Sequence, residues 1–220
     1  MAGSAKGAAA PTELEERIIS AAYDCFERFG IPKTTMEDIA RGAKSSRQSV
    51  YRYFTGKEDI LDAICCREAV KINIAVRAQI RRDMDFPALL TEALFVIITE
   101  GNKNTYLRQL VEVPATQSLA TNPRSRLYRL NVGYWHELMQ RSLQRGELAV
   151  DISLDEIIGW LLMMQSVLQL RLADGLIDET DLRRVIRRFT VAPLLKSAQT
   201  ADTDRQQMSS DACTARIPFE

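Results

Sequence analysis

Residues 34–61, TTMEDIARGAKSSRQSVYRYFTGKEDIL, constrain the fold most, because they encode two short helices with almost no chain between them. Thr34 or Thr35 can cap the first helix, and Ser46 can cap the second. The apolar residues of both segments recur at helical spacing, so each helix has one face for a core. The second helix also carries exposed polar and basic groups. The stretch therefore predicts a helix-turn-helix over about residues 35–54.

The second helix of this motif carries side chains suited to reading a DNA major groove. Arg47 can contact guanine through two hydrogen bonds, Gln48 can do the same with adenine, and Ser49 can donate or accept. Hydroxyl and ammonium groups nearby suit phosphates, which position a protein without reading the sequence. The predicted DNA-backbone contacts are Thr35, Lys44, Ser46, Tyr51, Tyr53 and Lys57.

Attraction to DNA must come from local charge segregation, because the chain has 29 Lys and Arg against 29 Asp and Glu. The segment from Lys44 to Lys57 also contains Arg47 and Arg52 and has no acidic residue. A solvated basic helix face beside two core aromatics explains this composition equally well. Composition alone leaves both interpretations open.

The order of the residues resembles the DNA-binding signature of TetR-family transcriptional regulators. The shared features are Thr35, Ile39-Ala40, Ala43, Val50 to Phe54, Lys57-Glu58 and Leu61. The preceding RIISAAYDCFERFGIPKTT is similar to the first helix of that family and its Gly-containing exit. The resemblance is strong over about residues 14–64, and only the length and the helical layout match beyond them.

The resemblance implies an all-α protein of about nine helices. An N-terminal three-helix domain would carry the helix-turn-helix, and a larger helical domain would bind a ligand and dimerise. The implied homodimer forms through about residues 153–196 and places two recognition helices on a palindromic double-stranded DNA operator. A small, apolar effector would move the fourth helix and release the DNA, as in a repressor. An activator of the same fold stays an alternative.

The connection between the two short helices departs from the family pattern, which usually has Gly-Val where this chain has Lys44 and Ser45. Lys44 must then adopt a conformation that glycine takes more easily, at a cost of about 1 kcal/mol. Gln48 stands where many members carry a small residue. It is therefore the favoured candidate for an operator-specific base contact.

Helical periodicity continues through most of the chain. A first helix opens at Thr12, and a long helix runs from the TGKED segment towards Arg82. Later helices are predicted at roughly 86–100, 104–119, 124–145, 153–175 and 178–196. The predicted domains are a disordered arm at 1–11, the helix-turn-helix domain at 12–58, the ligand-binding and dimerisation domain at 59–196 and a flexible tail at 197–220.

Aromatic and methionine side chains of the longer helices are candidates for an apolar ligand pocket, because they present adaptable surface. At helical spacing, residues of this kind are more often simply core residues, so they are proposed only as a group. They are Phe95, Tyr106, Leu110, Tyr134, Trp135, Met139, Trp160, Met163 and Met164.

No catalytic site, metal site or cofactor is predicted. His136 is the only histidine and lacks the partners of a metal site or a nucleophilic triad. The four cysteines, including the adjacent Cys65 and Cys66, have no zinc or disulfide spacing. The chain is expected to be cytoplasmic, non-enzymatic and without a membrane span. A small-molecule-binding or enzymatic helical protein with a merely solvated basic face is the alternative.

Overall fold

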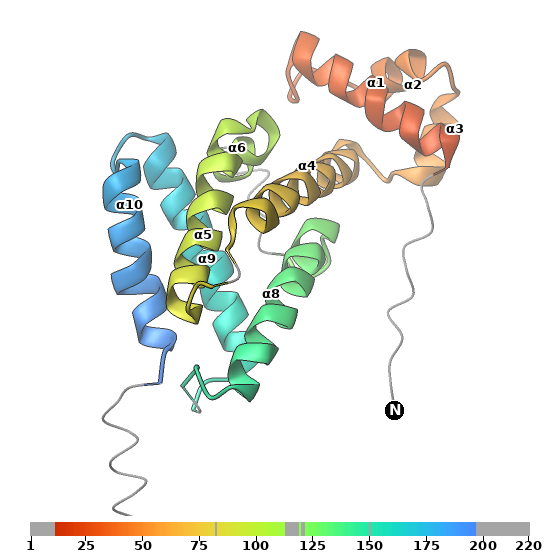
Figure 1. Cartoon of the computed structure of the whole chain (residues 1–220). Helices are drawn as coiled ribbons and strands as arrows, with labels where there is room; N and C mark the ends of the chain where they lie inside the picture. Colours follow the sequence, from red (N-terminus) through yellow and green to blue (C-terminus); the bar gives the residue numbers. More distant parts are fainter. Residues whose placement is uncertain (1–11, 82, 113–118, 120–121, 150, 197–220) are drawn as a thin grey trace, which may run out of the picture.

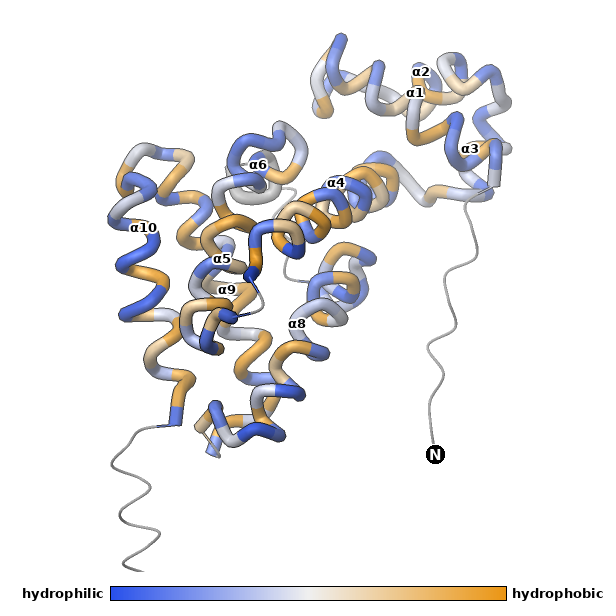
Figure 2. The backbone as a smooth tube through the Cα atoms, viewed as in Figure 1, coloured by the Kyte–Doolittle hydropathy of each residue, from blue (hydrophilic) through white to orange (hydrophobic). Residues whose placement is uncertain are grey.

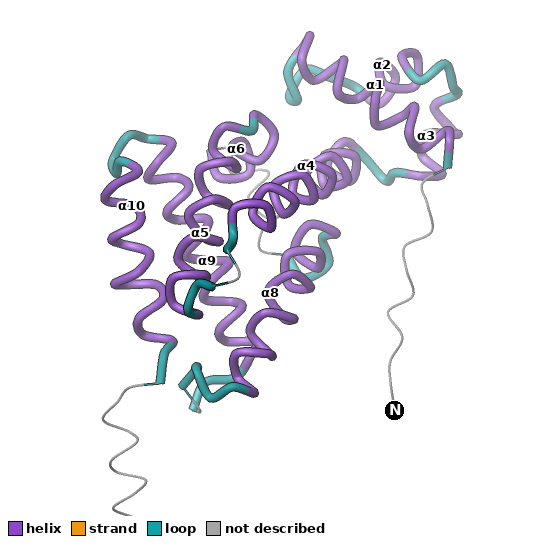
Figure 3. Tube along the Cα trace, viewed as in Figure 1, coloured by secondary structure: helices purple, strands orange, loops and turns teal. Residues whose placement is uncertain are grey.

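The computed structural model describes residues 12–81, 83–112, 119, 122–149 and 151–196, with residues 109–112 as backbone only (Figure 1). Among these residues there are helices and loops but no β-strand (Figure 3). The α-helices are α1 (Glu13–Phe29), α2 (Met36–Gly42), α3 (Arg47–Tyr53), α4 (Lys57–Gln79), α5 (Phe86–Lys103), α6 (Thr105–Glu112), α8 (Arg126–Gln144), α9 (Leu154–Ala173) and α10 (Glu179–Val185). A π-helix, η1 (Ile186–Val191), and a 3-10 helix, η2 (Ala192–Leu194), follow. The predicted all-α fold is confirmed, while the predicted arm at 1–11 and tail at 197–220 lie outside the described residues.

The helices of the N-terminal unit, α1 to α3, begin at hydroxyl residues. Thr12 and Ser46 cap α1 and α3 as predicted, each accepting a hydrogen bond from the backbone N–H three residues on. Thr35 rather than Thr34 caps α2, in a reciprocal capping box with Asp38. Thr34 is buried, and its hydroxyl donates to the carbonyls that end α1. Local hydrogen bonds thus set where all three helices start.

Two hydrophobic clusters form the interior, and α4 contributes to both (Figure 2). The first packs α1–α3 against the N-terminal half of α4, with Val50, Phe54 and Ile64 fully buried. The second lies among α5, α8, α9, α10 and η1 and takes Val76 from the C-terminal half of α4. Figure 1 shows α4 crossing from the N-terminal unit to the larger group of helices. Helix α4 therefore belongs to the core of each unit.

The prediction of the last helix at 178–196 is wrong for its second half. Regular α-helix stops at Val185 and gives way to η1, in which the Ala192 N–H reaches the carbonyl five residues back. Pro193 explains the change, because it has no N–H and its ring clashes with the carbonyl of the preceding turn. The Trp160 Nε1–H donates to the carbonyl of the buried Thr190, in η1, at 3.2 Å.

The other helices differ from prediction mainly at their ends. The predicted helix at 104–119 is described as α6 up to Glu112, and most of its remainder lies outside the described residues. The helix expected to run to Arg82 ends at Gln79. In the described part of the chain, no helix is long and apolar enough to cross a membrane.

Candidate nucleic-acid interface and ligand cavity

The turn between α2 and α3 depends on Lys44. Its φ is +51°, and it is the only non-glycine residue with a positive φ in the described part of the chain. The Ser45 N–H donates to the Ala40 carbonyl at 3.0 Å, and the Lys44 N–H donates to the Arg41 carbonyl at 3.1 Å. This pair of bonds is the Schellman arrangement that usually places glycine at the left-handed position. The prediction that Lys44 takes a glycine-type conformation is confirmed.

Helix α3 has an inner and an outer side. Val50 and Phe54 are 0% exposed and hold the helix against the first hydrophobic cluster. Arg47, Gln48 and Tyr51 are exposed on the helix, which has no acidic residue in its first turn. Two of the predicted base-reading side chains and one predicted phosphate contact therefore lie on the solvent side.

The three predicted base readers differ in their surroundings. The Arg47 guanidinium lies 5.3 Å from the centre of the Tyr51 ring and donates to its hydroxyl at 3.4 Å, which raises the pKa of Arg47. Ser49 is half-buried, and its hydroxyl lies 2.9 Å from that of the cap residue Ser46. Gln48 makes no hydrogen bond with the described residues. Gln48 is thus the side chain that can reach a base edge without giving up an intramolecular contact.

Lys57, a predicted phosphate contact, also has a structural role. Its ammonium donates to the carbonyls of Ile31 and Pro32 at 2.9 and 3.1 Å. These bonds tie the start of α4 to the connection between α1 and α2. An ammonium has three donors, so one N–H remains for a phosphate.

Thr35 and Tyr53, two further predicted phosphate contacts, have intramolecular partners as well. The Thr35 hydroxyl donates to the Asp38 carboxylate at 2.5 Å within the capping box. Hydrogen bonds with Thr12 and Arg52 lower the pKa of Tyr53, and the Arg52 guanidinium lies 5.3 Å from its ring centre. Lys44, by contrast, is exposed at the turn.

A cavity of about 560 Å³ lies among α4, α5, α6, α8 and α9. Its volume is within the range of roughly 300–1,000 Å³ that is typical of small-molecule sites. Aliphatic residues from four helices line it, among them Val76, Ile80, Leu89, Ala93, Ile97 and Leu138. Asn73, Arg77, Asn131, Glu137, Arg141 and Gln165 add polar and charged groups. The lining is therefore mainly apolar with a few polar positions.

Two of the predicted pocket residues, Tyr134 and Trp135, line this cavity. The Leu110 side chain lies outside the described residues. The other six candidates are described but are not among the lining residues. They are Phe95, Tyr106, Met139, Trp160, Met163 and Met164.

Specific contacts account for the six that lie elsewhere. The Arg183 guanidinium lies 3.4 Å from the centre of the Phe95 ring, and Tyr106 packs edge-on against Tyr23 at 4.8 Å.

Met139 is fully buried, whereas Met163 is 50% exposed. Met164 packs against the second hydrophobic cluster, and Trp160 bonds to η1. Aromatic or methionine identity does not reveal which helix face meets the cavity, so the sequence could not separate these cases.

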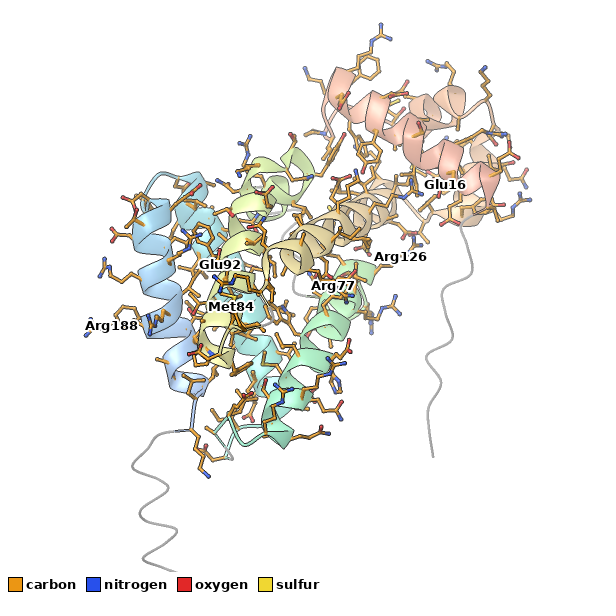
Figure 4. The ribbon with its side chains drawn as sticks, in the orientation of Figure 1. Glu16, Arg77, Met84, Glu92, Arg126 and Arg188 are labelled. Carbon is orange, nitrogen blue, oxygen red and sulfur yellow. The ribbon has the colours of Figure 1, made fainter. Side chains whose placement is uncertain are left out.

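A buried carboxylate that was not singled out from the sequence joins α4 to α8. Asp62 is 5% exposed and accepts from the backbone N–H groups of Arg126 and Leu127 at 2.6 and 3.0 Å. The Arg126 guanidinium pairs with Asp59 at 3.2 Å and lies 5.5 Å from the centre of the Phe54 ring (Figure 4). The N-terminus of α8 therefore contacts both α4 and the residue that ends α3.

A second carboxylate joins α4 to α1 and α6. Glu68 is 7% exposed and accepts from the Tyr23 hydroxyl, the Lys71 ammonium and the Asn104 amide, each at 2.7 Å. The Asn104 side-chain carbonyl in turn accepts from the backbone N–H of Tyr106 at 3.1 Å, at the start of α6. Burial raises the pKa of Glu68, but the three hydrogen bonds outweigh it and lower the pKa overall.

The thiols of Cys65 and Cys66 and the imidazole of His136 do not form a reactive site with the described residues around them. Burial raises the pKa of Cys65, and it raises the pKa of Cys66 to about 12, so both thiols are protonated at neutral pH. His136 is exposed. No group of three or more His, Cys, Asp or Glu residues placed to hold a metal ion occurs in the described part of the chain.

The geometry of α2 and α3 is that of a helix-turn-helix, and comparison with known proteins agrees. The sequence model of the bacterial regulatory proteins of the tetR family matches residues 18–64. The HTH-type transcriptional regulator SrpR of Pseudomonas putida is 25% identical over 159 residues, which are 70% of this chain and 72% of that protein. TtgW, another HTH-type transcriptional regulator of Pseudomonas putida, is 42% identical over 59 residues, which are 27% of this chain and 44% of that protein.

Solved structures show the same fold over most of the chain. Thermus thermophilus FadR, a TetR-family repressor in complex with lauroyl-CoA, has a TM-score of 0.62 and 20% identity, covering 83% of this chain and 96% of that one. SmeT, the repressor of the Stenotrophomonas maltophilia multidrug efflux pump SmeDEF, has a TM-score of 0.54 and 19% identity, covering 83% and 91%. A TetR-family regulator of Haemophilus influenzae has a TM-score of 0.56 and 19% identity, covering 86% and 100%.

The fold and the exposed basic helix define a DNA-binding transcriptional regulator with a helix-turn-helix. The match to residues 18–64, the similarity to SrpR and the shared fold of the solved structures support a TetR-family transcriptional regulator. The resemblance first seen in residues 14–64 is confirmed.

Proposed function

We propose that the protein is a homodimeric repressor that leaves a palindromic operator when a small, largely apolar effector fills the cavity. The observation that carries the proposal is the position of α4. Its first half packs in the same cluster as α3, and its second half supplies Asn73, Val76 and Arg77 to the cavity wall. A ligand that displaces the second half of α4 therefore acts on the helix that supports the DNA-reading surface, by which we mean the exposed side of α3 with Arg47, Gln48 and Tyr51.

Apolar side chains left exposed near the C-terminus support a dimer through about residues 153–196. Met163 and Val167, one turn apart on α9, are 50% and 46% exposed, and Phe189 on η1 is 56% exposed. The Trp160 bond to the Thr190 carbonyl places η1 against this part of α9. Exposed apolar residues that gather on neighbouring helices are typical of protein interfaces.

Within the operator complex, Gln48 and Arg47 read base edges, with Ser49 in a lesser role because its hydroxyl is engaged. Lys44, Tyr51 and the remaining donor of Lys57 hold phosphates. Ser46 and Thr35 are N-caps, where backbone N–H groups add to a phosphate contact, whereas Tyr53, the last residue of α3, offers its hydroxyl.

Selection of fragments from genomic DNA by the purified protein tests the proposal. The expected product is an inverted repeat whose two halves lie about one helical turn apart, bound by a dimer. Gel shifts of that fragment at several salt concentrations should give a steep salt dependence, and Lys57→Ala should reduce its slope by about one unit for every sequence tested. Failure to enrich any sequence, with a monomer in sedimentation, would refute the proposal.

An activator of the same fold is the second candidate, since nothing in the DNA-reading surface sets the sign of regulation. Reporter expression from the selected promoter decides between them, because a repressor gives higher expression after deletion of the gene and an activator gives lower expression. The structurally similar protein SmeT is a repressor, which favours repression for this protein as well. The lauroyl-CoA bound by Thermus thermophilus FadR makes acyl chains a reasonable first set of effectors to test.

A further inference from the structure

The charged side chains that line the cavity are not all paired with a group of opposite charge. Its lining includes three charged side chains from the described residues, Arg77, Glu137 and Arg141. Glu137 and Arg141 form an ion pair at 2.5 Å, one helical turn apart on α8. The Arg77 Nε–H donates to the amide oxygen of Asn73 at 3.0 Å, and no described carboxylate lies within ion-pair distance of Arg77. The cavity lining thus carries one positive charge that no neighbouring acid neutralises.

Arg77 lies at the rim of the cavity rather than away from it. It is exposed in the last turn of α4, on a side of that helix that faces α8 (Figure 4). Burial raises the pKa of Tyr134, a lining residue of α8, while the positive charge of Arg77 lowers it. Arg77 and Tyr134 both line the cavity, one from α4 and the other from α8, so the guanidinium charge lies on the same site as the phenol.

Hydrogen-bonding groups surround this charge, and apolar groups lie beyond it. Asn73 and Tyr134 offer an amide and a hydroxyl beside Arg77. Val76 on α4, Ile80 directly after it, and Ala93 on α5 line the cavity with aliphatic surface. The site therefore combines one cationic, hydrogen-bonding end with an apolar interior.

We propose that the effector is an amphiphile with one anionic head group, a carboxylate or a phosphate, which Arg77 binds while the apolar tail fills the cavity. This inference rests on the proposed role of the cavity as the effector site. A guanidinium presents a planar fork of donors that matches both oxyanions, and charge-assisted hydrogen bonds are the strongest kind available here. Glu137 is already paired with Arg141, so a cationic head group has no vacant carboxylate in the lining and meets the Arg77 charge instead.

Calorimetric titration with four ten-carbon probes tests this inference, with each probe kept below its micelle concentration. The probes are decanoate, decyl phosphate, decanol and decyltrimethylammonium, which have alkyl tails of nine or ten carbons and differ in head-group charge. Decanoate and decyl phosphate should bind with at least about tenfold higher affinity than decanol, as expected for one charge-assisted hydrogen-bonding contact. The ammonium probe should bind most weakly. The ratio between decanoate and decyl phosphate identifies the head group.

Variants at Arg77 assign the preference to this side chain. Arg77→Gln should remove the advantage of the two anions and leave the affinity for decanol unchanged, because the tail contacts remain. Arg77→Lys should retain part of the advantage. Arg28→Gln, which alters an exposed arginine in the last turn of α1, is the matched control and should behave like the unaltered protein. Thermal unfolding of each variant checks that the fold is intact.

The outcomes separate this inference from the proposed function. Equal binding of decanol and decanoate, or an anion preference that survives Arg77→Gln, overturns the anionic head group while leaving the cavity as a ligand site. Absence of binding by all four probes overturns both. Loss of the anion preference in Arg77→Gln alone, with decanol binding retained, supports both.

Discussion

In the N-terminal unit, α2 and α3 are each seven residues long, and each begins at a hydroxyl residue of its own segment. The cavity, by contrast, takes its walls from five helices that lie between Lys57 and Ala173. The proposed DNA-reading surface is therefore a local structure, formed mainly by contacts between near neighbours in sequence. The cavity exists only after distant helices have packed.

Helix α4 connects the N-terminal unit to the helices around the cavity, so a displacement of α4 at the cavity can reach α3. Helix α4 takes part in both hydrophobic clusters along its length, and Asp62 and Glu68 bind it to partners on either side.

The largest effect is expected from Asp62→Ala. The substitution leaves the backbone N–H groups of Arg126 and Leu127 without their buried acceptor, and it should lower the free energy of unfolding by about 3 kcal/mol. Urea denaturation measures the change. Asp62→Asn keeps one acceptor oxygen and should cost less, while Asp174→Ala, an exposed aspartate at the end of α9, should cost almost nothing. A loss below about 0.5 kcal/mol would mean that α8 does not depend on this cap.

Gln48→Ala should act on DNA recognition and not on folding. If Gln48 contacts adenine, binding should weaken by about 1–3 kcal/mol on the selected operator and by much less when that base pair is changed. Competition binding with a set of single-base operator variants measures this pattern. A uniform loss on every operator would show that Gln48 contacts the DNA backbone.

Glu68→Gln should alter the pH dependence of stability. Because the folded-state pKa of Glu68 is lowered, its ionised form stabilises the protein above the unfolded pKa of about 4.3, and this stabilisation is lost as the pH falls through the folded value. The variant should be less stable at pH 7, by on the order of 1 kcal/mol for the weakened hydrogen bonds, and the difference should shrink towards pH 3. Denaturation curves across this range test it, and a difference independent of pH would contradict the assignment.

The smallest effect is expected from Lys44→Gly. Removing the side chain relieves the positive φ of +51° and should stabilise the fold by about 1 kcal/mol or less. The same change removes a cation from the DNA-facing turn, so operator affinity should fall at low salt. Thermal unfolding and gel shifts on one preparation measure the two opposite changes. Destabilisation by the glycine would show that Lys44 makes a folding contact.

The accuracy of the predictions from sequence also differs between features set by local contacts and features set by distant ones. The caps at Thr12, Thr35 and Ser46 and the unusual turn at Lys44 follow from residues within a few positions of one another. The end of the last helix was misjudged, although Pro193 marks it, because helical spacing continues past the point where the backbone hydrogen bonds change register.

The sequence alone determined the N-terminal unit and its outward chemistry, because hydrogen bonds between residues three or four apart fix where short helices begin and which side chains face out. Tertiary structure decided which side chains line the cavity and gave Asp62 and Glu68 their roles. The partners of Asp62 lie up to 65 residues away, and Tyr23 lies 45 residues from Glu68. Such contacts depend on how whole helices pack, and helical periodicity records only that a face is apolar, not what it meets.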